Sequence, residues 1–368
     1  MNVTDMYDFV VVGVGPAGAR FSRRAARRGH DVLALEQGTV GTPLACSGHV
    51  STDVWAFTGD GARDELLQNE IYGARFHVGG PNSEAYPFYK DEVASNVVDR
   101  VGLDRHLAAL AREAGVDVRE AHTVTDVREH HDRVEVVASG PDETHTFEAK
   151  LVAGCDGPRS KVRAELGLPE PGELLHGVLA FSEEEDHQDF VDVHLTAPTF
   201  FAWRIPRGDA GVEYGLAAPP GVQVNKHFEE LIDGYEIDVA RRCSGAIPIG
   251  PPNRVTSRRG FLIGDAAGQT KPFTGGGILY GMTSADHAAR KIDPDWPSTL
   301  EAYERAWRDD LERDQFLGQW IRRAYSLPEP VQRIGLRVLS GEIGVHMDRP
   351  TSLVSPRHLR AMASRLWR

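Results

Sequence analysis

Short, continuous apolar runs and helical patterns alternate along the first part of the chain. Residues 9–12 form a β-branched and aromatic run, which is typical of a buried strand. Residues 17–28 have the composition of a helix, and residues 31–35 form a second apolar run. Two more runs of the same kind follow later, at residues 151–154 and 261–263. Buried strands that alternate with helices predict an α/β fold.

Three glycines follow the first run at the G-x-G-x-x-G spacing. Gly13 allows a tight turn, Gly15 lets the backbone approach a pyrophosphate, and Gly18 lets the next helix pack close to the strand. The free N–H groups and the dipole of that helix then face the phosphates. Glu36, at the end of the second strand, can accept a hydrogen bond from a ribose hydroxyl. This order predicts a Rossmann-like site for a dinucleotide, either FAD or NAD(P).

Acidic and glycine-rich turns follow the two later runs. Asp156 comes directly after one of them, where a carboxylate would lie at the sheet edge at which α/β folds bind ligands. Asp265 follows the other and can hydrogen-bond a ribityl or ribose hydroxyl. Residues 275–277 are glycines that allow close backbone approach, and a helix begins near Ile278. The amino end of that helix would stabilise negative charge on a reduced flavin ring.

Two more side chains each allow a functional and a structural interpretation. Cys46 lies in a loop that starts near the dinucleotide, so it either relays a proton or shapes the pocket, or it is simply a small buried residue. Arg100 begins a helical pattern, so it either contacts the cofactor or starts a solvated helix. The sequence alone leaves both pairs of alternatives open.

The second half of the chain begins with strands and ends with helices. Residues 173–245 are strand-like and broken by Pro and Gly, which suits an antiparallel sheet that serves as a substrate platform. Within them Phe201, Trp203 and Ile205 are spaced by two and therefore share one face. Facing a cavity, this stripe would line an apolar tunnel; facing a second layer, it would be ordinary core. From residue 297 onward, long helical patterns take over.

Composition narrows the class of protein. The 368 residues are enough for two domains. Acidic residues outnumber basic ones by 54 to 41, which gives a net charge of −13 and argues against a nucleic-acid partner. Excess acid with only six Lys fits a protein adapted to high salt, although a GC-rich genome also favours Arg.

The three Cys form no C-x-x-C pair, so we expect no metal site and a reducing cytoplasm. The start of the chain is polar and is not a signal peptide, and no run of about 18 apolar residues could cross a membrane. Residues 356–367 predict a short basic amphipathic helix. It either touches an anionic membrane from the cytoplasmic side or packs on its own domain.

The separated motifs resemble the flavoprotein group built on the para-hydroxybenzoate hydroxylase plan. Within that group the chain resembles the geranylgeranyl reductase family, especially the archaeal branch that saturates the isoprenoid chains of membrane lipids. The closer match rests on the loop at residues 46–48, the stretch at residues 201–206 and the stretch at residues 272–278. The family usually has Tyr-x-Trp-x-Phe-Pro, whereas here Phe201 and Ile205 replace the Tyr and the Phe, so the hydroxyl is lost.

The resemblance implies a Rossmann-like FAD-binding domain (residues 1–70, 99–170 and 255–295), an inserted antiparallel substrate sheet (71–98 and 171–254) and a C-terminal helical region (296–368). It implies FAD contacts at Gly13, Gly15, Pro16, Ala17, Gly18, Glu36, Gln37, Cys46, Arg100, Asp156, Gly264, Asp265, Gly275, Gly276, Gly277 and Ile278. It implies a substrate pocket formed by Phe201, Trp203, Ile205 and Pro206. Cys46 and Trp203 are its candidates for the catalytic machinery.

The implied activity is an FAD-dependent reduction of carbon–carbon double bonds in isoprenoid chains, by hydride transfer in an apolar site that excludes water. The electron donor stays open between NAD(P)H, a ferredoxin and a deazaflavin. One alternative is an oxygen-using monooxygenase or halogenase, although a halogenase also needs a Lys and the surroundings of Lys90 show no sign of that role. The other alternative is a flavin-carrying lipid binder without catalysis.

Overall fold

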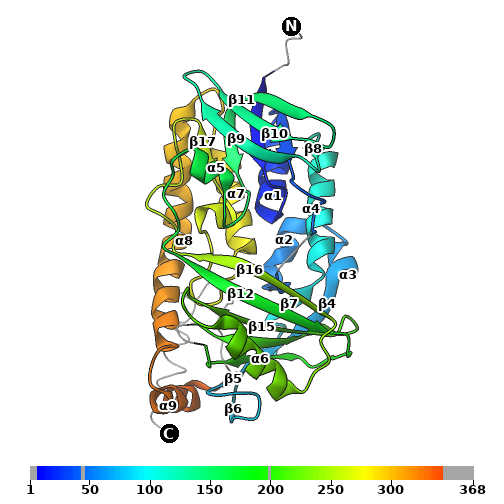
Figure 1. Ribbon diagram of the computed structural model, residues 1–368, viewed down its shortest axis with the longest axis vertical. Helices are drawn as coiled ribbons and strands as arrows, with labels where there is room; N and C mark the ends of the chain where they lie inside the picture. The colour runs from blue at the N-terminus through cyan, green and yellow to red at the C-terminus, as the bar shows by residue number, and fades with distance from the viewer. Residues whose placement is uncertain (1–5, 43–45, 198–199, 343–368) are drawn as a thin grey trace.

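The computed structural model describes residues 6–42, 46–197 and 200–342. Three sheets organise this part of the chain: one of seven strands, one of eight and one of three. The seven-stranded sheet lies at the end of the molecule from which the N-terminus emerges, and the eight-stranded sheet lies towards the opposite end (Figure 1). Both predicted parts of the fold, the α/β part and the inserted sheet, are therefore present.

The seven-stranded sheet is built around the first predicted strand. Its order is β8 (Asp117–Arg119), β2 (Val32–Leu35), β1 (Tyr7–Val12), β11 (Thr144–Gly154), β10 (Val134–Ser139) and β9 (Thr123–Glu129), with β17 (Gly260–Leu262) also paired to β11. The pairings of β1 with β2 and β11, of β2 with β8, and of β11 with β17 are parallel. The apolar runs of β1 and β17 thus lie next to that of β11 in one sheet, as parallel strands covered on both faces do.

Helices cover this sheet and complete its core. Helix α1 (Pro16–Ala26) packs between α4 (Arg100–Glu113) and α7 (Ile278–Lys291). The rings of Phe9 and Phe21 meet edge to face at 5.2 Å, and Phe261 approaches Phe21 at the same distance. Short α5 (Lys161–Glu165) follows β11, and the long helix α8 (Leu300–Ala324) buries Tyr303 and Trp307 in the same core.

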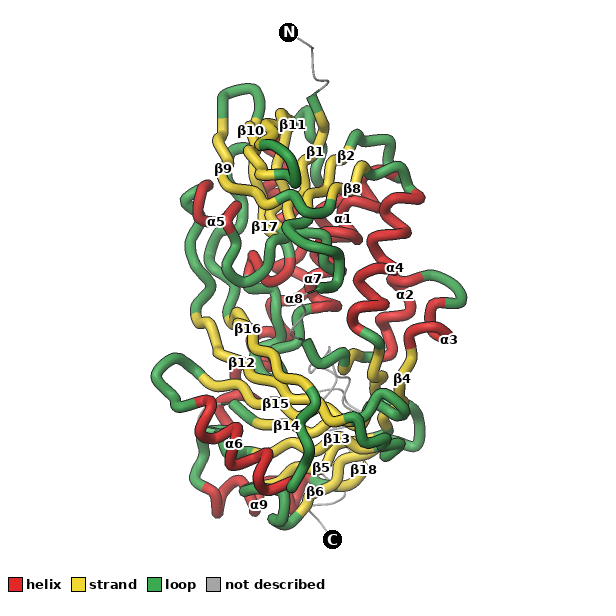
Figure 2. Tube along the Cα trace, turned by 45° about the vertical axis from the view of Figure 1, so that its right-hand side comes forward, coloured by secondary structure: helices red, strands yellow, loops and turns green. Residues whose placement is uncertain are grey.

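The eight-stranded sheet has the order β16 (Arg241–Ile249), β12 (Glu173–Ser182), β15 (Val212–Ala218), β14 (Ala202–Pro206), β13 (Phe190–His194), β5 (Gly73–His77), β6 (Ala85–Tyr89) and β18 (Gly341–Glu342). Most pairings are antiparallel, as predicted, but β5 pairs with β13 and β6 with β18 in parallel. These strands come from distant segments, so no hairpin forces them to run in opposite directions. Helix α6 (Val224–Tyr235) packs on this sheet (Figure 2).

A small sheet joins the two bodies. Strand β7 (Ser95–Val98) pairs with β3 (His49–Val50) and β4 (Leu67–Ile71), and the short helices α2 (Trp55–Thr58) and α3 (Ala62–Leu66) lie between β3 and β4 along the chain. The expected domains assign residues 71–98 to the substrate sheet and residues 296–368 to a C-terminal helical region. In the structure β7 belongs to the small sheet instead, and β18 adds a short strand to the eight-stranded sheet. Helix α9 (Glu329–Leu339) follows α8, as the pattern predicts, and the predicted helix at 356–367 lies outside the described residues.

Candidate active site

A cavity of about 360 Å³ lies between the two large sheets. One side is formed by the glycine turn after β1 and by the loop that leads into α7. The other side is formed by the inner face of the eight-stranded sheet, including Gly177, Leu179 and Trp203. The predicted site residues that line it are Gly15, Pro16, Ala17, Cys46, Arg100, Trp203, Gly264, Asp265, Gly275, Gly276, Gly277 and Ile278.

The three glycines of the turn after β1 have different surroundings. Gly13 has φ +91°, and a Cβ there would overlap the carbonyl oxygen of Cys155. A Cβ on Gly18 would overlap the carbonyl oxygen of Gly13, so both positions need glycine for the backbone to pack. A Cβ on Gly15 would meet nothing within 4 Å, because this residue borders the cavity at the amino end of α1. The open cradle at Gly15 fits a bound pyrophosphate.

Glu36 lies at the carboxyl end of β2, beside the same turn. Its Oε2 accepts a hydrogen bond from the backbone N–H of Val14 at 2.9 Å, and its Oε1 accepts one from Gly38 at 3.3 Å. Glu36 and the exposed Gln37 do not line the cavity. Their contacts to the cofactor stay predictions.

Arg100 is buried, so the solvated-helix interpretation of this residue is wrong. Its Nη1 donates to Asp104 Oδ1 at 2.8 Å, and its Nε donates to Cys46 Sγ at 3.3 Å. Burial alone would lower the pKa of Arg100, but the Asp104 carboxylate raises it above its ordinary range. The guanidinium thereby fixes the Cys46 thiol at the cavity wall.

The apolar stripe divides between the cavity wall and the core. Trp203 lines the cavity, whereas Phe201, Ile205 and Pro206 are buried outside it. Phe201 stacks on Phe200 with ring centroids 4.5 Å apart, and Ile205 packs against residues of the small sheet, Ile71 of β4 and Val97 of β7. The middle of the stripe thus lines a cavity while its ends are ordinary core, because neighbouring elements cover those ends.

Trp203 is held by two residues that sequence reasoning missed. Its Nε1 donates to Glu213 Oε1 at 2.9 Å, and a Cβ on Gly215 would overlap the indole. Burial raises the pKa of Glu213 to about 7, although the hydrogen bond from Trp203 opposes this shift. The one feature of the sequence that could have indicated Glu213 was an acidic residue within the otherwise apolar strand β15.

The loop into α7 forms the remaining wall. Burial raises the pKa of Asp265 to about 6, although Arg100 opposes this effect. Gly277 leaves room for the Asp265 carboxylate and precedes the first residue of α7, whose amino end therefore borders the cavity. Lys271, which the sequence analysis did not single out, also lines this wall and is only 4% exposed.

Asp156 is not among the residues that line the cavity. Its carboxylate accepts hydrogen bonds from Ser160 Oγ at 2.6 Å and from the N–H of Val162 at 3.0 Å. It therefore caps the first turn of α5, while its neighbours Cys155 and Gly157 face the cavity. Its predicted contact to the cofactor is not tested by this placement.

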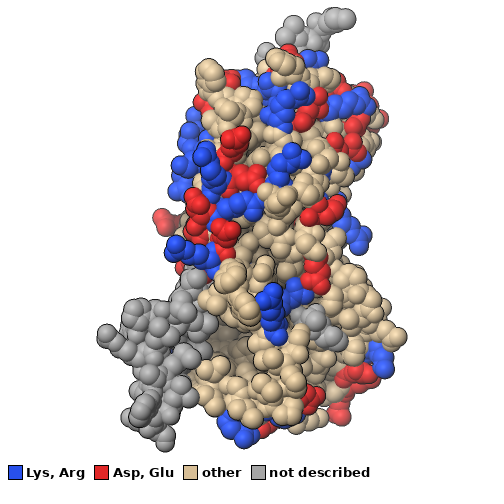
Figure 3. Space-filling view, turned by 90° about the vertical axis from the view of Figure 1, so that its left-hand side faces the viewer, with Lys and Arg blue, Asp and Glu red and all other residues tan. Residues whose placement is uncertain are grey.

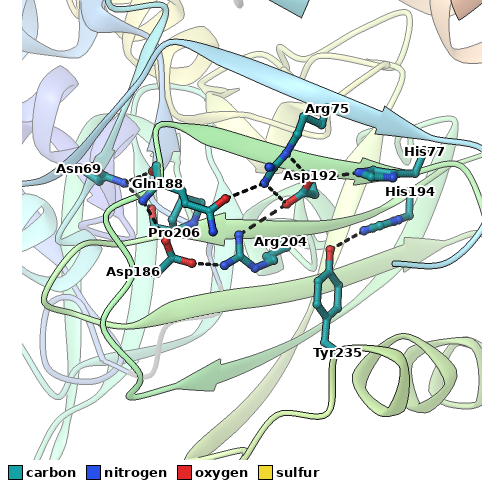
Figure 4. Close-up of polar contacts among 10 residues, drawn as sticks. All are labelled: Asn69, Arg75, His77, Asp186, Gln188, Asp192, His194, Arg204, Pro206 and Tyr235. Atoms are coloured by element: carbon teal, nitrogen blue, oxygen red, sulfur yellow. Dashed lines mark hydrogen bonds and ion pairs between the residues drawn. The ribbon is translucent and has the colours of Figure 1, made fainter. Parts of the chain in front are cut away.

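A buried polar network supports the sheet on the face opposite Trp203. Asp192 accepts from Arg75 Nε at 2.8 Å, forms an ion pair with Arg204 at 3.5 Å and lies 3.0 Å from His77 Nε2 (Figure 4). Arg204 follows Trp203 along β14 and therefore points to the other face. Burial and the nearby His77 lower the pKa of His194 to about 4, so this ring is neutral at neutral pH. The network ties β5, β13 and β14 together behind the cavity wall.

Among the described residues, one group could hold a metal ion: Glu185, His187 and Asp209, which are all exposed and do not line the cavity. Exposed acidic groups of this kind are common without an ion. The described part of the chain also contains no helix long and apolar enough to cross a membrane.

The open turn at Gly15, the amino end of α7 and the eight-stranded sheet that faces them form the site of an FAD-dependent oxidoreductase. Residues 6–212 match the family model described as FAD binding domain. The chain is 31% identical, over 83% of its length and 80% of the relative's, to digeranylgeranylglycerophospholipid reductase 1 of Methanococcoides burtonii. It is 30% identical, over 84% of its length and 85% of the relative's, to digeranylgeranylglycerophospholipid reductase 2 of Methanothermobacter thermautotrophicus. The chain belongs to the geranylgeranyl reductase family.

Solved structures share the fold. A geranylgeranyl bacteriochlorophyll reductase-like protein from Thermoplasma acidophilum matches with a TM-score of 0.82 at 21% identity, over 98% of this chain and 99% of that one. A p-nitrophenol 4-monooxygenase from Pseudomonas putida matches with a TM-score of 0.71 at 18% identity, over 98% and 97%. The predicted cofactor, FAD, and the predicted fold are confirmed. The prediction of salt adaptation gains no support, since the relatives come from methanogens and Thermoplasma.

Proposed function

We propose that this protein saturates carbon–carbon double bonds in the geranylgeranyl chains of archaeal membrane lipids or their precursors. The observation that carries the proposal is the cavity itself, in which the open turn at Gly15, suited to a pyrophosphate, lies opposite a largely apolar wall. The names of the relatives, digeranylgeranylglycerophospholipid reductases, point to the same substrate class. Gly15, Glu36, Arg100, Asp265 and the amino end of α7 would hold FAD, which when bound supplies the hydride for the reduction.

The protein's own residues would position the alkene and exclude water. An isolated alkene has no carbonyl to polarise, so it must be held flat in a dry site. The indole of Trp203, fixed by Glu213, offers a flat apolar surface beside Gly177 and Leu179. Cys46 Sγ, held by Arg100 at the wall, is the candidate donor of the proton that the second alkene carbon receives.

An anaerobic turnover tests this function. The FAD-loaded protein is reduced with dithionite, a geranylgeranylated lipid is added, and the product is weighed by mass spectrometry. We expect the flavin to reoxidise while each converted bond gains two hydrogens. The C46S variant should keep FAD but lose at least tenfold in rate, whereas C243S, which changes a thiol outside the cavity lining, should behave as the wild type.

Other outcomes of that assay identify the rival functions. A flavin that stays reduced until oxygen enters, with a product that gains oxygen or halogen, contradicts the reductase. Retention of FAD without any alkene-dependent reoxidation indicates a lipid binder. The same assay, with dithionite replaced in turn by NADPH, a reduced ferredoxin and a reduced deazaflavin, identifies the electron donor.

We also propose that the protein meets its lipid at the surface of a membrane on the cytoplasmic side. Helix α9 lies at the end of the molecule remote from the seven-stranded sheet (Figure 1). Its side chains Val331, Ile334 and Val338 follow helical spacing on one face and are 48%, 65% and 51% exposed. The face that α8 presents bears many charges towards the seven-stranded sheet and few towards the opposite end (Figure 3). An end with few charges on this face and with exposed aliphatic side chains suits contact with lipid.

A further inference from the structure

We propose that a second cavity, at the elbow between α8 and α9, binds the hydroxyl-bearing head group of an isoprenoid lipid whose chain extends to the flavin cavity. The inference rests on the proposed function, because it says where the polar end of that substrate lies. The second cavity has a volume of about 310 Å³. It is formed by residues 195–197 after β13, by residues 325–327 between α8 and α9, and by Glu329 and Gln332 of α9, which turns away from the end of α8 (Figure 1).

The flavin cavity is too small for the whole substrate. A cavity of about 150 Å³ holds benzene, so a geranylgeranyl chain, with more than three times as many carbon atoms, needs about 500 Å³. The flavin cavity measures about 360 Å³ and must also take the flavin ring. Part of the lipid therefore lies elsewhere while one of its double bonds meets the flavin.

One layer of aromatic rings separates the two cavities. Trp203 lines the flavin cavity, and its ring centroid lies 5.6 Å from that of Phe201. The ring of Phe201 meets that of Tyr325 edge to face at 5.8 Å, and Tyr325 lines the second cavity. Leu195, which also lines the second cavity, packs in the same apolar cluster as these three rings. A displacement of Phe201 and Tyr325 would thus open an apolar path from one cavity to the other.

The second cavity has a polar end that suits a ligand with hydroxyl groups. Thr196, Ser326 and Gln332 line it with hydroxyl and amide groups. Gln332 is 8% exposed, and its Nε2 donates to the carbonyl oxygen of Tyr325 at 2.8 Å, which fixes the amide. Its Oε1 has no hydrogen-bond partner among the described residues. Because buried amide oxygens normally accept a hydrogen bond, this atom is the acceptor that a ligand hydroxyl would satisfy.

The charge of the second cavity favours a neutral polyol over a phosphate. Of the described residues that line it, Glu329 is the charged one, and it lies 3.7 Å from Arg333. Its carboxylate occupies the first turn of α9, where the helix would otherwise attract an anion. Phosphate sites rely on Arg, Lys or a free helix terminus, and this lining offers no cation. The bound head group is therefore one that brings hydroxyl donors rather than a free diphosphate.

The second cavity also lies next to the face at which we place the membrane. Leu327 lines the cavity and is 46% exposed. The exposed aliphatic face of α9 begins at Val331, beside Gln332 along the chain. A lipid that leaves the membrane at this face can keep its head group at the elbow while its chain passes inward.

Equilibrium binding to the oxidised, FAD-loaded protein tests the proposal without turnover. The probe is a geranylgeranyl glycerol ether in detergent micelles, and the change in flavin absorbance reports the arrival of its chain. Q332M removes the amide, and S326W fills the second cavity with a bulky ring. Q319W places the same ring at an exposed position of α8 that does not line the cavity. We expect Q332M and S326W each to bind at least tenfold more weakly, and Q319W to stay within twofold of the wild type.

Two comparisons separate a contact to the head group from a structural role of Gln332. Q332E keeps an acceptor but loses the donor to Tyr325, so it should bind the glycerol ether more tightly than Q332M does. Geranylgeranyl diphosphate should bind the wild type and Q332M equally, because its head group does not use the amide.

The outcomes distinguish this inference from the proposed function. Binding of the glycerol ether that neither Q332M nor S326W weakens would overturn the head-group site and leave the proposed function intact. A wild-type flavin that responds to no isoprenoid would contradict the proposed function and the head-group site together.

Photo-crosslinking to the wild-type protein decides the question if the variants do not fold. One probe carries a diazirine at the glycerol end and another carries it at the far end of the chain, and the labelled peptides are identified by mass spectrometry. We expect the glycerol end to label residues 325–332 and the chain end to label the walls of the flavin cavity. Labelling of the flavin cavity by the glycerol end contradicts the proposal.

Discussion

Gly15 and Gly18 belong to the same motif, but alanine at Gly15 should weaken FAD binding, whereas alanine at Gly18 should lower the stability of the fold. Gly15 has φ −68° and open space around it, so an alanine fits the free protein and obstructs only a bound pyrophosphate. Alanine at Gly18 would collide with the backbone at Gly13. We expect G15A to unfold at the wild-type temperature yet to bind FAD at least tenfold more weakly. G18A should lose about 1–3 kcal/mol of folding free energy through overpacking.

Thermal unfolding of the FAD-free proteins and a fluorescence titration with FAD separate the two effects. Unchanged FAD affinity in G15A would mean that the cradle is not where the pyrophosphate binds.

Glu213 should make the stability of the protein depend on pH. Its pKa is 4.5 in an unfolded chain and about 7 in the folded protein, so folding holds its proton more tightly. The favourable contribution is complete below pH 4.5 and is lost as the pH rises through about 7. Since one pKa unit corresponds to about 1.4 kcal/mol, the loss amounts to about 3 kcal/mol.

The E213Q variant keeps an acceptor for Trp203 Nε1 but has no titratable group. We therefore expect the free energy of unfolding of E213Q, relative to that of the wild type, to rise by about 3 kcal/mol between pH 4.5 and pH 8. Urea unfolding across this range measures the difference, with E143Q at an exposed position as the control. A difference that does not change with pH would place the ionisation of Glu213 outside this range.

Helix α9 provides the prediction at the scale of a single element. Each exposed aliphatic side chain that enters a lipid surface contributes about 1.5–3 kcal/mol. The double variant I334D/V338D should therefore bind anionic liposomes at least tenfold more weakly in a sedimentation assay, with no change in FAD content. Trp296 is 67% exposed near the start of α8, and W296D is the matched control. Equal loss of binding in both variants would argue against a specific role for α9.

At the scale of the whole molecule, the sequence predicted those features that depend on residues close together along the chain. The run of β1, the glycines after it and the acid at Glu36 predicted one nucleotide unit, because turn and helix geometry depend on neighbouring residues. The helical character of α8 and α9 followed from the pattern after residue 297 for the same reason. The arrangement of Asp265 and residues 275–277 around one cavity also followed, since parallel strands end at one edge of a sheet.

Pairings between distant segments could not be predicted in this way. Nothing in the spacing of Phe201, Trp203 and Ile205 tells which of them a remote element covers. The parallel pairing of β5 with β13 depends on how two separate insertions meet. Glu213 appears in the sequence as an ordinary charge, and only its burial against Trp203 makes it a candidate for function.

The centre of the nucleotide sheet has a consequence for how the protein is made. Val10 of β1 pairs with Val152 of β11, and Val152 pairs with Gly260 of β17. Strand β1 therefore gains its partner β11 only after residue 152 has been synthesised, and β11 gains β17 only after residue 260. Folds dominated by such non-local pairings fold slowly and are exposed to aggregation meanwhile. FAD would contact both Gly15 and the loop before α7. Its binding would therefore hold an early segment of the newly synthesised chain to a late one.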